Sequence, residues 1–297
     1  MASLKLQLIG LCRLVWICWI VLLAAPCFAA QATPGKGSGV EPLRIGVLAY
    51  RGAERAVQDW QAHADYLGQK LAPQRFRIVP LTLAEFAPAI AARQIDFVVT
   101  NTGHYVELEA GGAISRIATM RVSGPMGPVD RFGGTVIARA DREDLNGFSD
   151  LRGKRIAAPD TKGFGGWQVH LRDARAAGLD LHHDLAEVLE LQAHDKVVAA
   201  VLAGRVDAGF VRSDLIESLA AAGKLDPATV KVIGERKTPG FPYRHSSQLY
   251  PHWPFAKLDH IPEELARDLL IALLGLSADH PAARAAGIHG WTLPQNY

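Results

Sequence analysis

Short apolar runs alternate along the chain with longer segments whose apolar residues recur every three or four positions. The first run covers residues 43–49, and the periodic segment after it covers 53–71, with Val57, Trp60 and Ala64 on one stripe. Apolar runs of this length predict buried strands, and the periodic spacing predicts helices. The same alternation predicts further strands at 76–81, 95–100, 114–121, 134–138, 156–158, 185–191, 206–211 and 230–233, and helices at 83–92, 105–110, 167–174, 196–203, 215–222, 265–276 and 281–286. Such alternation predicts an α/β fold with mainly parallel sheets.

An internal repeat divides the predicted elements into two sets. At an unchanged offset of 111 positions the following residues align: Arg44 with Arg155, Gly52 with Gly163, Asp96 with Asp207, and Gly112 with Gly223. A constant offset across four separate elements predicts two lobes of like topology. In open α/β sheets, ligands bind beyond the carboxyl ends of the strands. We therefore expect a ligand cleft between the lobes, where those strand ends face each other.

One stretch, residues 154–172, carries the pattern of an anion-binding turn. It reads as a short apolar strand stopped by Pro159, a polar glycine-rich turn, and a helix with Trp167 on its apolar face. A helix that opens after glycines presents unpaired backbone N–H groups and the positive end of its dipole, which together favour an anion. The same pattern is also typical of a capped loop with no ligand.

The first 30 residues have the pattern of a signal peptide. Lys5 and Arg13 precede or enter an apolar core, and small residues follow it at 29–30. The apolar core is short for a membrane span, although an uncleaved anchor is the alternative, and Cys27 gives a weak hint of lipidation. Residues 31–42 are rich in Gly, Ser, Pro and Thr and predict a flexible linker. We therefore expect an exported protein of the periplasm.

Composition removes several classes of function. All 3 cysteines lie in the signal segment, so the remaining chain has no disulfide, cysteine nucleophile or cysteine-ligated metal. The chain has 32 basic and 30 acidic residues, and two of the basic ones leave with the signal peptide. That balance argues against a nucleic-acid partner. Adjacent His182 and His183 point apart, which favours a surface loop over a metal site. We expect neither a cofactor nor a metal.

The chain resembles the periplasmic substrate-binding proteins of phosphate, phosphite and phosphonate ABC transporters. The resemblance rests on IDFVVTNTGHYVELE, DLRGKRIAAPDTKGFGG and HDKVVAAVLAGRVDAGFVRSDLIE. The pieces FGGTVIARADRED and HSSQLYPHWPFA also resemble the periplasmic sensor domain of tetrathionate-type histidine kinases. The resemblance implies a type II periplasmic-binding-protein fold with two lobes, each a mainly parallel sheet flanked by helices. We assign residues 43–133 and 247–297 to the first lobe and 134–246 to the second.

The resemblance also implies where the ligand is bound. The family's oxoanion seat falls on residues 160–166, with Asp160, Thr161, Lys162, Gly163, Phe164 and Gly165 as the expected ligand contacts. Its partner loop falls on Asn101, Thr102, Gly103 and His104, and its histidine–acid pair on His194 and Asp195. From their positions at strand ends we add Tyr50, Arg51 and Arg212. Arg212 stands where a small polar residue is usual, and its fork would favour a strongly anionic ligand such as an inorganic or sulfur oxoanion.

Each of these residues has a plain structural alternative. Asn101 and Asp195 suit helix caps, Arg51 suits a solvated turn, and His104 suits a helix start at the surface. Trp167 suits the core, whereas Tyr50 and Phe164 suit the walls of a cleft. Arg212 is our firmest candidate, because a charge at the end of a buried strand needs a partner.

The sequence therefore predicts a monomeric solute-binding protein that closes on a small oxoanion and presents it to a membrane permease. A ligand-sensing component that works with a histidine kinase is the alternative; a chain complete at Tyr297 would need another protein to signal. A hydrolase of phosphate or sulfate esters is disfavoured, because the chain lacks a G-x-S-x-G elbow and an H-E-x-x-H helix. We predict no enzymatic activity.

Overall fold

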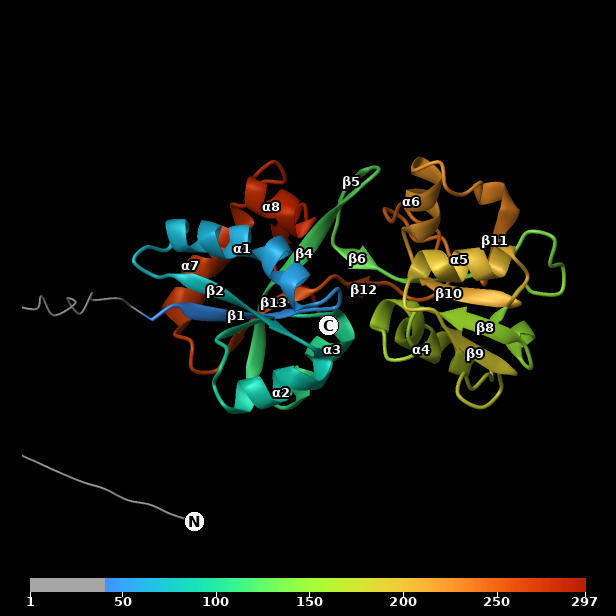
Figure 1. The fold of residues 1–297 in the computed structure, drawn as a ribbon, viewed down its shortest axis with the longest axis horizontal. Coiled ribbons are helices and arrows are strands. Elements are labelled where there is room, and N and C mark those ends of the chain that lie inside the picture. The colour runs from blue at the N-terminus through green and yellow to red at the C-terminus, as the bar shows by residue number, and fades with distance from the viewer. Residues whose placement is uncertain (1–40) are drawn as a thin grey trace, which may run out of the picture. The chain divides into compact units, whose positions relative to one another are not determined.

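The computed structural model describes residues 41–297, so the predicted signal peptide and most of the predicted linker lie outside the described residues. In the described part, no helix is long and apolar enough to cross a membrane. Two separate sheets, each flanked by helices, organise this part of the chain, and they can be followed in Figure 1.

The first sheet is built from the two ends of the described chain. Its strand order is β14–β4–β13–β3–β1–β2, with β5 paired to the end of β4. The strands are β1 (Leu43–Leu48), β2 (Phe76–Leu81), β3 (Phe97–Val99), β4 (Ile114–Gly124), β5 (Gly127–Val129), β13 (Pro254–Leu258) and β14 (Gly290–Thr292). β13 lies between β3 and β4, so the returning chain occupies the middle of the sheet.

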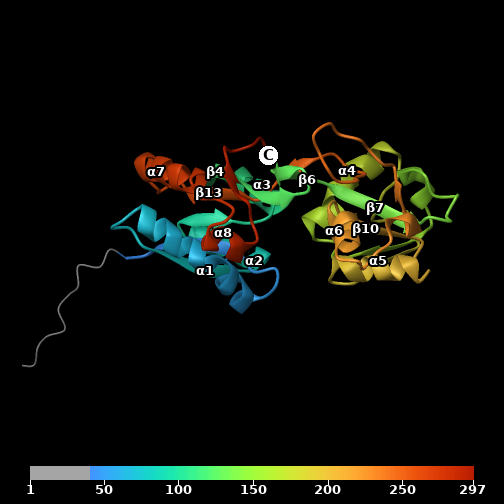
Figure 2. The same cartoon turned by 90° about the horizontal axis from the view of Figure 1, so that it is seen from above.

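Helices cover both faces of the first sheet. The helices of this lobe are α1 (Ala53–Lys70), α2 (Leu83–Ala91), α3 (Thr102–Ala110), α7 (Glu263–Leu274) and α8 (Pro281–Ala286). Trp60, Leu67 and Leu269 on α1 and α7 pack with Phe97 and Phe255 of the sheet in one apolar cluster. The opposite face packs on α2 and α3. Figure 2 shows α1 and α8 along one side of this sheet, in agreement with their extensive contacts.

The second sheet has the order β11–β7–β10–β8–β9. Its strands are β7 (Gly134–Arg139), β8 (Arg155–Ala158), β9 (Glu187–Glu190), β10 (Ala208–Arg212) and β11 (Val230–Ile233). Its helical elements are η1 (Phe148–Leu151), η2 (Phe164–Gln168), α4 (Val169–Ala176), α5 (His194–Leu202), α6 (Leu215–Ala221) and η3 (Pro227–Thr229). Apolar clusters on the two faces pack this sheet against α4 and η2 on one side and against α5 and α6 on the other.

The chain crosses between the sheets twice, and the crossings pair with each other. β6 (Arg131–Phe132) pairs antiparallel with β12 (Tyr250–Pro251). His252 N–H also donates to the carbonyl of Asp130 at 2.8 Å. The first sheet takes its strands from residues before β6 and after β12, and the second takes its strands from the residues between them.

Both sheets are mixed, and most strands of each run in one direction. In the first sheet β1 pairs in parallel with β2 and β3, and in the second β8 pairs in parallel with β9 and β10. β4 runs in the same direction as β3, because β13 is antiparallel to both, and β11 runs in the same direction as β10, because β7 is antiparallel to both. β13 pairs antiparallel with both β3 and β4, and its run of proline and aromatic residues gave no strand period. The predicted α/β class is confirmed, with sheets that combine parallel and antiparallel pairing.

The repeat predicted at an offset of 111 is present in three dimensions. Asp96 accepts from Arg44 N at 2.7 Å and from its Nε at 2.9 Å. Asp207 accepts from Arg155 N at 2.9 Å and from its Nε at 3.2 Å. Asp96, which precedes β3, thus holds the start of the parallel strand β1, and Asp207, which precedes β10, holds the start of the parallel strand β8 in the same way. The matched contacts support two lobes of like topology.

Candidate ligand-binding site

Arg212 ends β10 at the carboxyl edge of the second sheet and points toward the crossings. Its guanidinium carbon lies 4.8 Å from the ring centroid of Phe132 on β6, and its Nη2 lies 3.1 Å from His252 Nε2. Arginine has no acceptor, so His252 accepts this bond and must be neutral. The Nε of Arg212 is buried without a hydrogen-bond partner in residues 41–297, and the nearest oxygen of Asp214 is 3.6 Å away. Arg212 therefore keeps a donor that a ligand oxygen can use.

The buried His252 and the partly buried His194 flank Arg212 and stay uncharged. Burial lowers the pKa of His194 to about 4, and the charge of Arg212 adds to the effect. Burial and Arg212 also lower the pKa of His252 well below its usual value. His194 Nδ1 accepts from the backbone N–H of Arg212 at 3.2 Å. Both rings thus act as neutral acceptors that hold the arginine.

Residues of the first lobe form a hollow in front of Arg212. This space, the Arg212 hollow, has a volume of about 130 Å³ and includes Tyr50, Trp253 and His252 in its lining. Tyr50 packs edge-on to Trp253 with ring centroids 5.6 Å apart. Arg51 does not join them: it is exposed and lines a different surface hollow.

The predicted partner loop lies at a second hollow, the Lys162 hollow, of about 510 Å³. Asn101, His104, Lys162 and Gln168 are among its lining residues. Asn101 caps α3 by accepting from His104 N–H at 2.9 Å, and Thr100 shares a hydrogen bond of 2.9 Å with His104 Nδ1. Burial lowers the pKa of His104. The predicted cap role of Asn101 is therefore present, and His104 is buried rather than at the surface.

Phe164 lies between the two hollows. A Cβ added to Gly103 would lie 2.4 Å from Phe164 Cδ2, so α3 and η2 meet at closest approach there. Phe164 also packs edge-on to Phe132, with centroids 5.8 Å apart, and Phe132 in turn lies under Arg212. The structure thus brings Gly103 and Phe164 together but places Arg212 and Lys162 in separate hollows.

The glycine turn lies beside Arg212, while the residues before it make local bonds. A Cβ at Gly165 would contact the Arg212 side chain at 3.7 Å, and one at Gly166 would contact His194 at 3.1 Å. The first turn is a π-helical turn, η2, that contains these glycines. Thr161 N–H donates to Glu190 at 2.8 Å, and Asp160 accepts from Lys162 N–H at 2.8 Å. Gly163 N–H donates to the Asp160 carbonyl at 3.1 Å.

Two predicted positions have other surroundings. Thr102 is buried and donates to the Pro251 carbonyl at 2.6 Å, which ties α3 to the crossing β12. Asp195 is exposed in the first turn of α5.

Three residues around Arg212 were not predicted from the sequence: His252, Phe132 and Asp214. His252 lies in the aromatic segment 240–255, which has no helical or strand periodicity and so gave no signal that its side chain would lie near Arg212.

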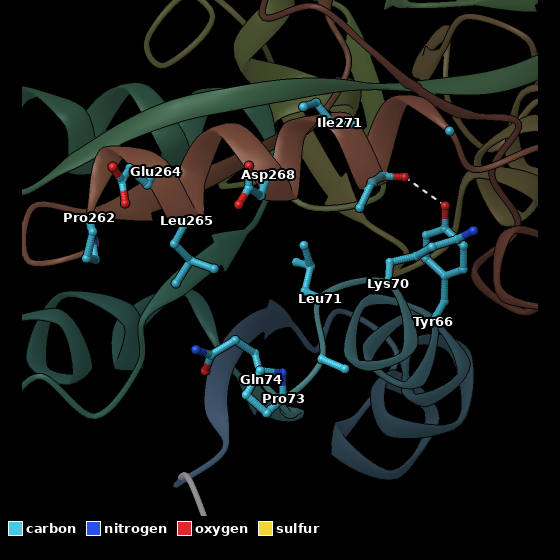
Figure 3. Close-up of a pocket in the computed structure, with 13 residues that line it drawn as sticks. Tyr66, Lys70, Leu71, Pro73, Gln74, Pro262, Glu264, Leu265, Asp268 and Ile271 are labelled. Atoms are coloured by element: carbon cyan, nitrogen blue, oxygen red, sulfur yellow. Dashed lines mark hydrogen bonds between the residues drawn. The ribbon is translucent and has the colours of Figure 1, made fainter.

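A further hollow of about 820 Å³ lies away from these residues, between the end of α1 and α7 (Figure 3). Tyr66 donates to the Ala272 carbonyl at 2.8 Å on its wall. Glu264 and Asp268 line it against one cation, Lys70. This hollow also lies beside Gln74, which precedes β2, and therefore at the amino ends of the parallel strands. The excess of carboxylates and this location both disfavour an anion in this hollow.

Comparison with known proteins agrees with this geometry. The sequence profile described as "ABC transporter, phosphonate, periplasmic substrate-binding protein" matches residues 45–296. The chain belongs to this family. This binding protein therefore has the type II periplasmic-binding-protein fold, and its family consists of periplasmic substrate-binding proteins rather than enzymes.

Solved structures with the same fold include two phosphonate-binding proteins. PhnD1 of Prochlorococcus marinus in complex with methylphosphonate is 12% identical, with a TM-score of 0.61, and the match covers 85% of this chain and 92% of that one. A binding component of a phosphonate ABC transporter from Pseudomonas aeruginosa is 13% identical, with a TM-score of 0.60 and coverage of 85% and 82%. At these identities the likeness concerns the fold.

A sensor protein is also similar in sequence. The tetrathionate sensor histidine kinase TtrS of Salmonella typhimurium is 29% identical over 258 residues, which is 87% of this chain. The match spans only 42% of the length of that kinase. The predicted resemblance to this sensor domain is confirmed.

Proposed function

We propose that this binding protein closes on a small oxoanion, with Arg212 as its main charged contact, and presents the anion to the permease of an ABC transporter. The observation that carries this proposal is the buried Nε of Arg212, which has an ion-pair contact of 3.6 Å to Asp214 but no hydrogen-bond partner in residues 41–297, beside a hollow lined from the other lobe. A buried donor without an acceptor is costly, and a ligand oxygen would remove that cost. The fold of the family, with strand ends of two lobes near each other, supports the same location.

Closure follows from the positions of the contacts. Arg212, His194 and the glycines of η2 belong to the second lobe, whereas Tyr50 and Trp253 of the Arg212 hollow belong to the first. A ligand held by both sets stabilises the state in which the lobes are close, because only that state offers all contacts. The chain would act as a monomer and bind its ligand without turnover.

A thermal-shift panel of phosphate, phosphite, methylphosphonate, methanesulfonate, sulfate, thiosulfate and tetrathionate tests the proposal. A ligand at a hundred times its dissociation constant should add about 2.7 kcal/mol to the free energy of unfolding. Absence of a shift with every anion would overturn it. Recovery of each ligand unchanged after incubation separates a binder from a hydrolase.

Sensing is the second candidate, because of the similarity to the periplasmic part of a sensor kinase. Deletion of the gene decides between the two. Loss of ligand uptake supports transport, and loss of ligand-dependent transcription with normal uptake supports sensing. Periplasmic extracts should contain the protein, and its mature N-terminus should follow residue 30 if the predicted signal peptide is cleaved.

A further inference from the structure

The surroundings of Arg212 contain little net positive charge. Asp214 lies 3.6 Å from Arg212 Nε, and Glu217 on α6 acts on Asp214 as a like charge. His194 and His252 hold the arginine as neutral acceptors. Asp59, which also lines the Arg212 hollow, pairs with Arg55 at 2.8 Å. Among the described residues, Arg212 is thus the one cation in the lining of this hollow, and carboxylates lie close to it.

Apart from Arg212, Asp59 and His252, most side chains that line the hollow are apolar or aromatic. Its lining includes Trp60, Met120, Val122 and Ile288, together with the edge-on pair Tyr50 and Trp253. Inorganic oxoanions are polar on every side and leave such walls without a partner. A ligand with a small apolar group can cover these side chains while its anionic end reaches Arg212.

From these two features we propose that the Arg212 hollow selects a small organic monoanion of the alkylsulfonate type over inorganic or dianionic oxoanions. The proposal rests on the proposed function, and it revises the expectation that Arg212 favours a strongly anionic ligand. One arginine offsets one negative charge. The second negative charge of a dianionic ligand would lie near the carboxylates of Asp214 and Glu217 without a cation to pair with. In a partly desolvated site this arrangement is unfavourable.

Isothermal titration with ethanesulfonate, ethylphosphonate, phosphate and sulfate, each at about pH 5.5 and about pH 8.5, tests this directly. Ethanesulfonate is a monoanion at both values, whereas ethylphosphonate loses its second proton between them, as phosphate groups do. We expect unchanged affinity for ethanesulfonate and at least about tenfold weaker binding of ethylphosphonate at the higher pH. Phosphate and sulfate should bind more weakly than ethanesulfonate at both.

The variant Asp214→Asn examines the cause. Asp214 has a φ of 85°, a conformation that asparagine tolerates, so the variant should fold. Removing the carboxylate charge should reduce the loss of ethylphosphonate affinity at the higher pH, while ethanesulfonate binding at the two pH values stays equal.

Three results overturn the proposal and are distinguishable. Tighter binding of ethylphosphonate as the dianion, or of phosphate or sulfate than of ethanesulfonate, refutes monoanion selection but leaves the proposed function intact. An Asp214→Asn variant with the same pH dependence as the wild type refutes the role of that charge. No binding of any anion refutes the proposed function itself.

Discussion

Arg212 donates a hydrogen bond from Nη2 to His252 Nε2 at 3.1 Å, and this bond joins the last residue of β10 to the crossing that returns to the first sheet. It exists only while His252 is neutral, which burial ensures. The arginine that we assign to the ligand therefore also links the two lobes. Under the proposed function, ligand binding and the contact between the lobes would depend on the same side chain.

The substitution Arg212→Gln should weaken anion binding. It removes a charge-assisted hydrogen bond worth about 1.5–3 kcal/mol, so the dissociation constant should rise about 10- to 100-fold in titration calorimetry. The exposed Arg175 on α4 provides a matched control, because Arg175→Gln removes the same charge away from the hollow. Equal affinity of wild type and Arg212→Gln would assign the arginine a purely structural role.

The substitution Gly103→Ala should reduce ligand affinity without destabilising the fold. Its Cβ would lie 2.4 Å from Phe164 Cδ2, so α3 and η2 must move apart. The double variant Gly103→Ala/Phe164→Leu should regain affinity, because the smaller side chain frees that space. In α1, Gly68→Ala meets its nearest atom at 3.7 Å and should leave affinity unchanged while stabilising the helix by about 0.5–1 kcal/mol. Failure of the double variant to recover would refute the steric argument.

The substitution Asp207→Asn should destabilise the second lobe in a pH-dependent manner. Burial opposes ionisation of Asp207, but hydrogen bonds from Arg155 and Arg142 outweigh it and lower its pKa to about 2. A carboxyl whose pKa falls from 3.8 to about 2 on folding contributes about 2 kcal/mol above pH 4, and this is lost as the pH falls toward 2. Urea unfolding at pH 7 should show that difference, and it should shrink in acid. A constant difference would rule out the ionised carboxylate as its source.

The substitution His170→Leu should make the protein less sensitive to acid. His170 is fully buried against Phe210, with centroids 4.6 Å apart, and neither ring nitrogen has a partner in the described chain. Burial lowers the pKa of His170 to about 3, so the folded state takes up its proton later than the unfolded state. Its stabilising effect is complete above pH 6.5 and is lost as the pH falls toward 3.

Between pH 7 and pH 5 this histidine alone should cost about 2 kcal/mol of the free energy of unfolding. His170→Leu should remove that share of the decline in urea unfolding, whereas the exposed His182→Leu should not. Identical pH profiles of the wild type and His170→Leu would show that another group causes the acid sensitivity.

Local pattern determined most elements of this protein. The strands β1, β2, β8 and β11 and the helices α1 and α8 follow from apolar spacing, because burial on a sheet face or a helix stripe is encoded in neighbouring residues. The repeat at 111 positions was also visible in sequence, and the pairs Arg44–Asp96 and Arg155–Asp207 give its physical basis. The family was also recognised from short stretches of sequence, and Arg212 became a candidate because it ends a predicted strand.

Tertiary structure alone decided which of the candidate residues meet. β13 lies in the centre of a sheet although its run of proline and aromatic residues has no strand period, since its hydrogen bonds go to strands more than a hundred residues away. The contact of His252 with Arg212, the approach of Gly103 to Phe164 and the exposure of Arg51 depend on how the crossings place two separate sheets. The spacing of residues along the chain does not predict those contacts, because they arise from packing between segments that are remote in sequence.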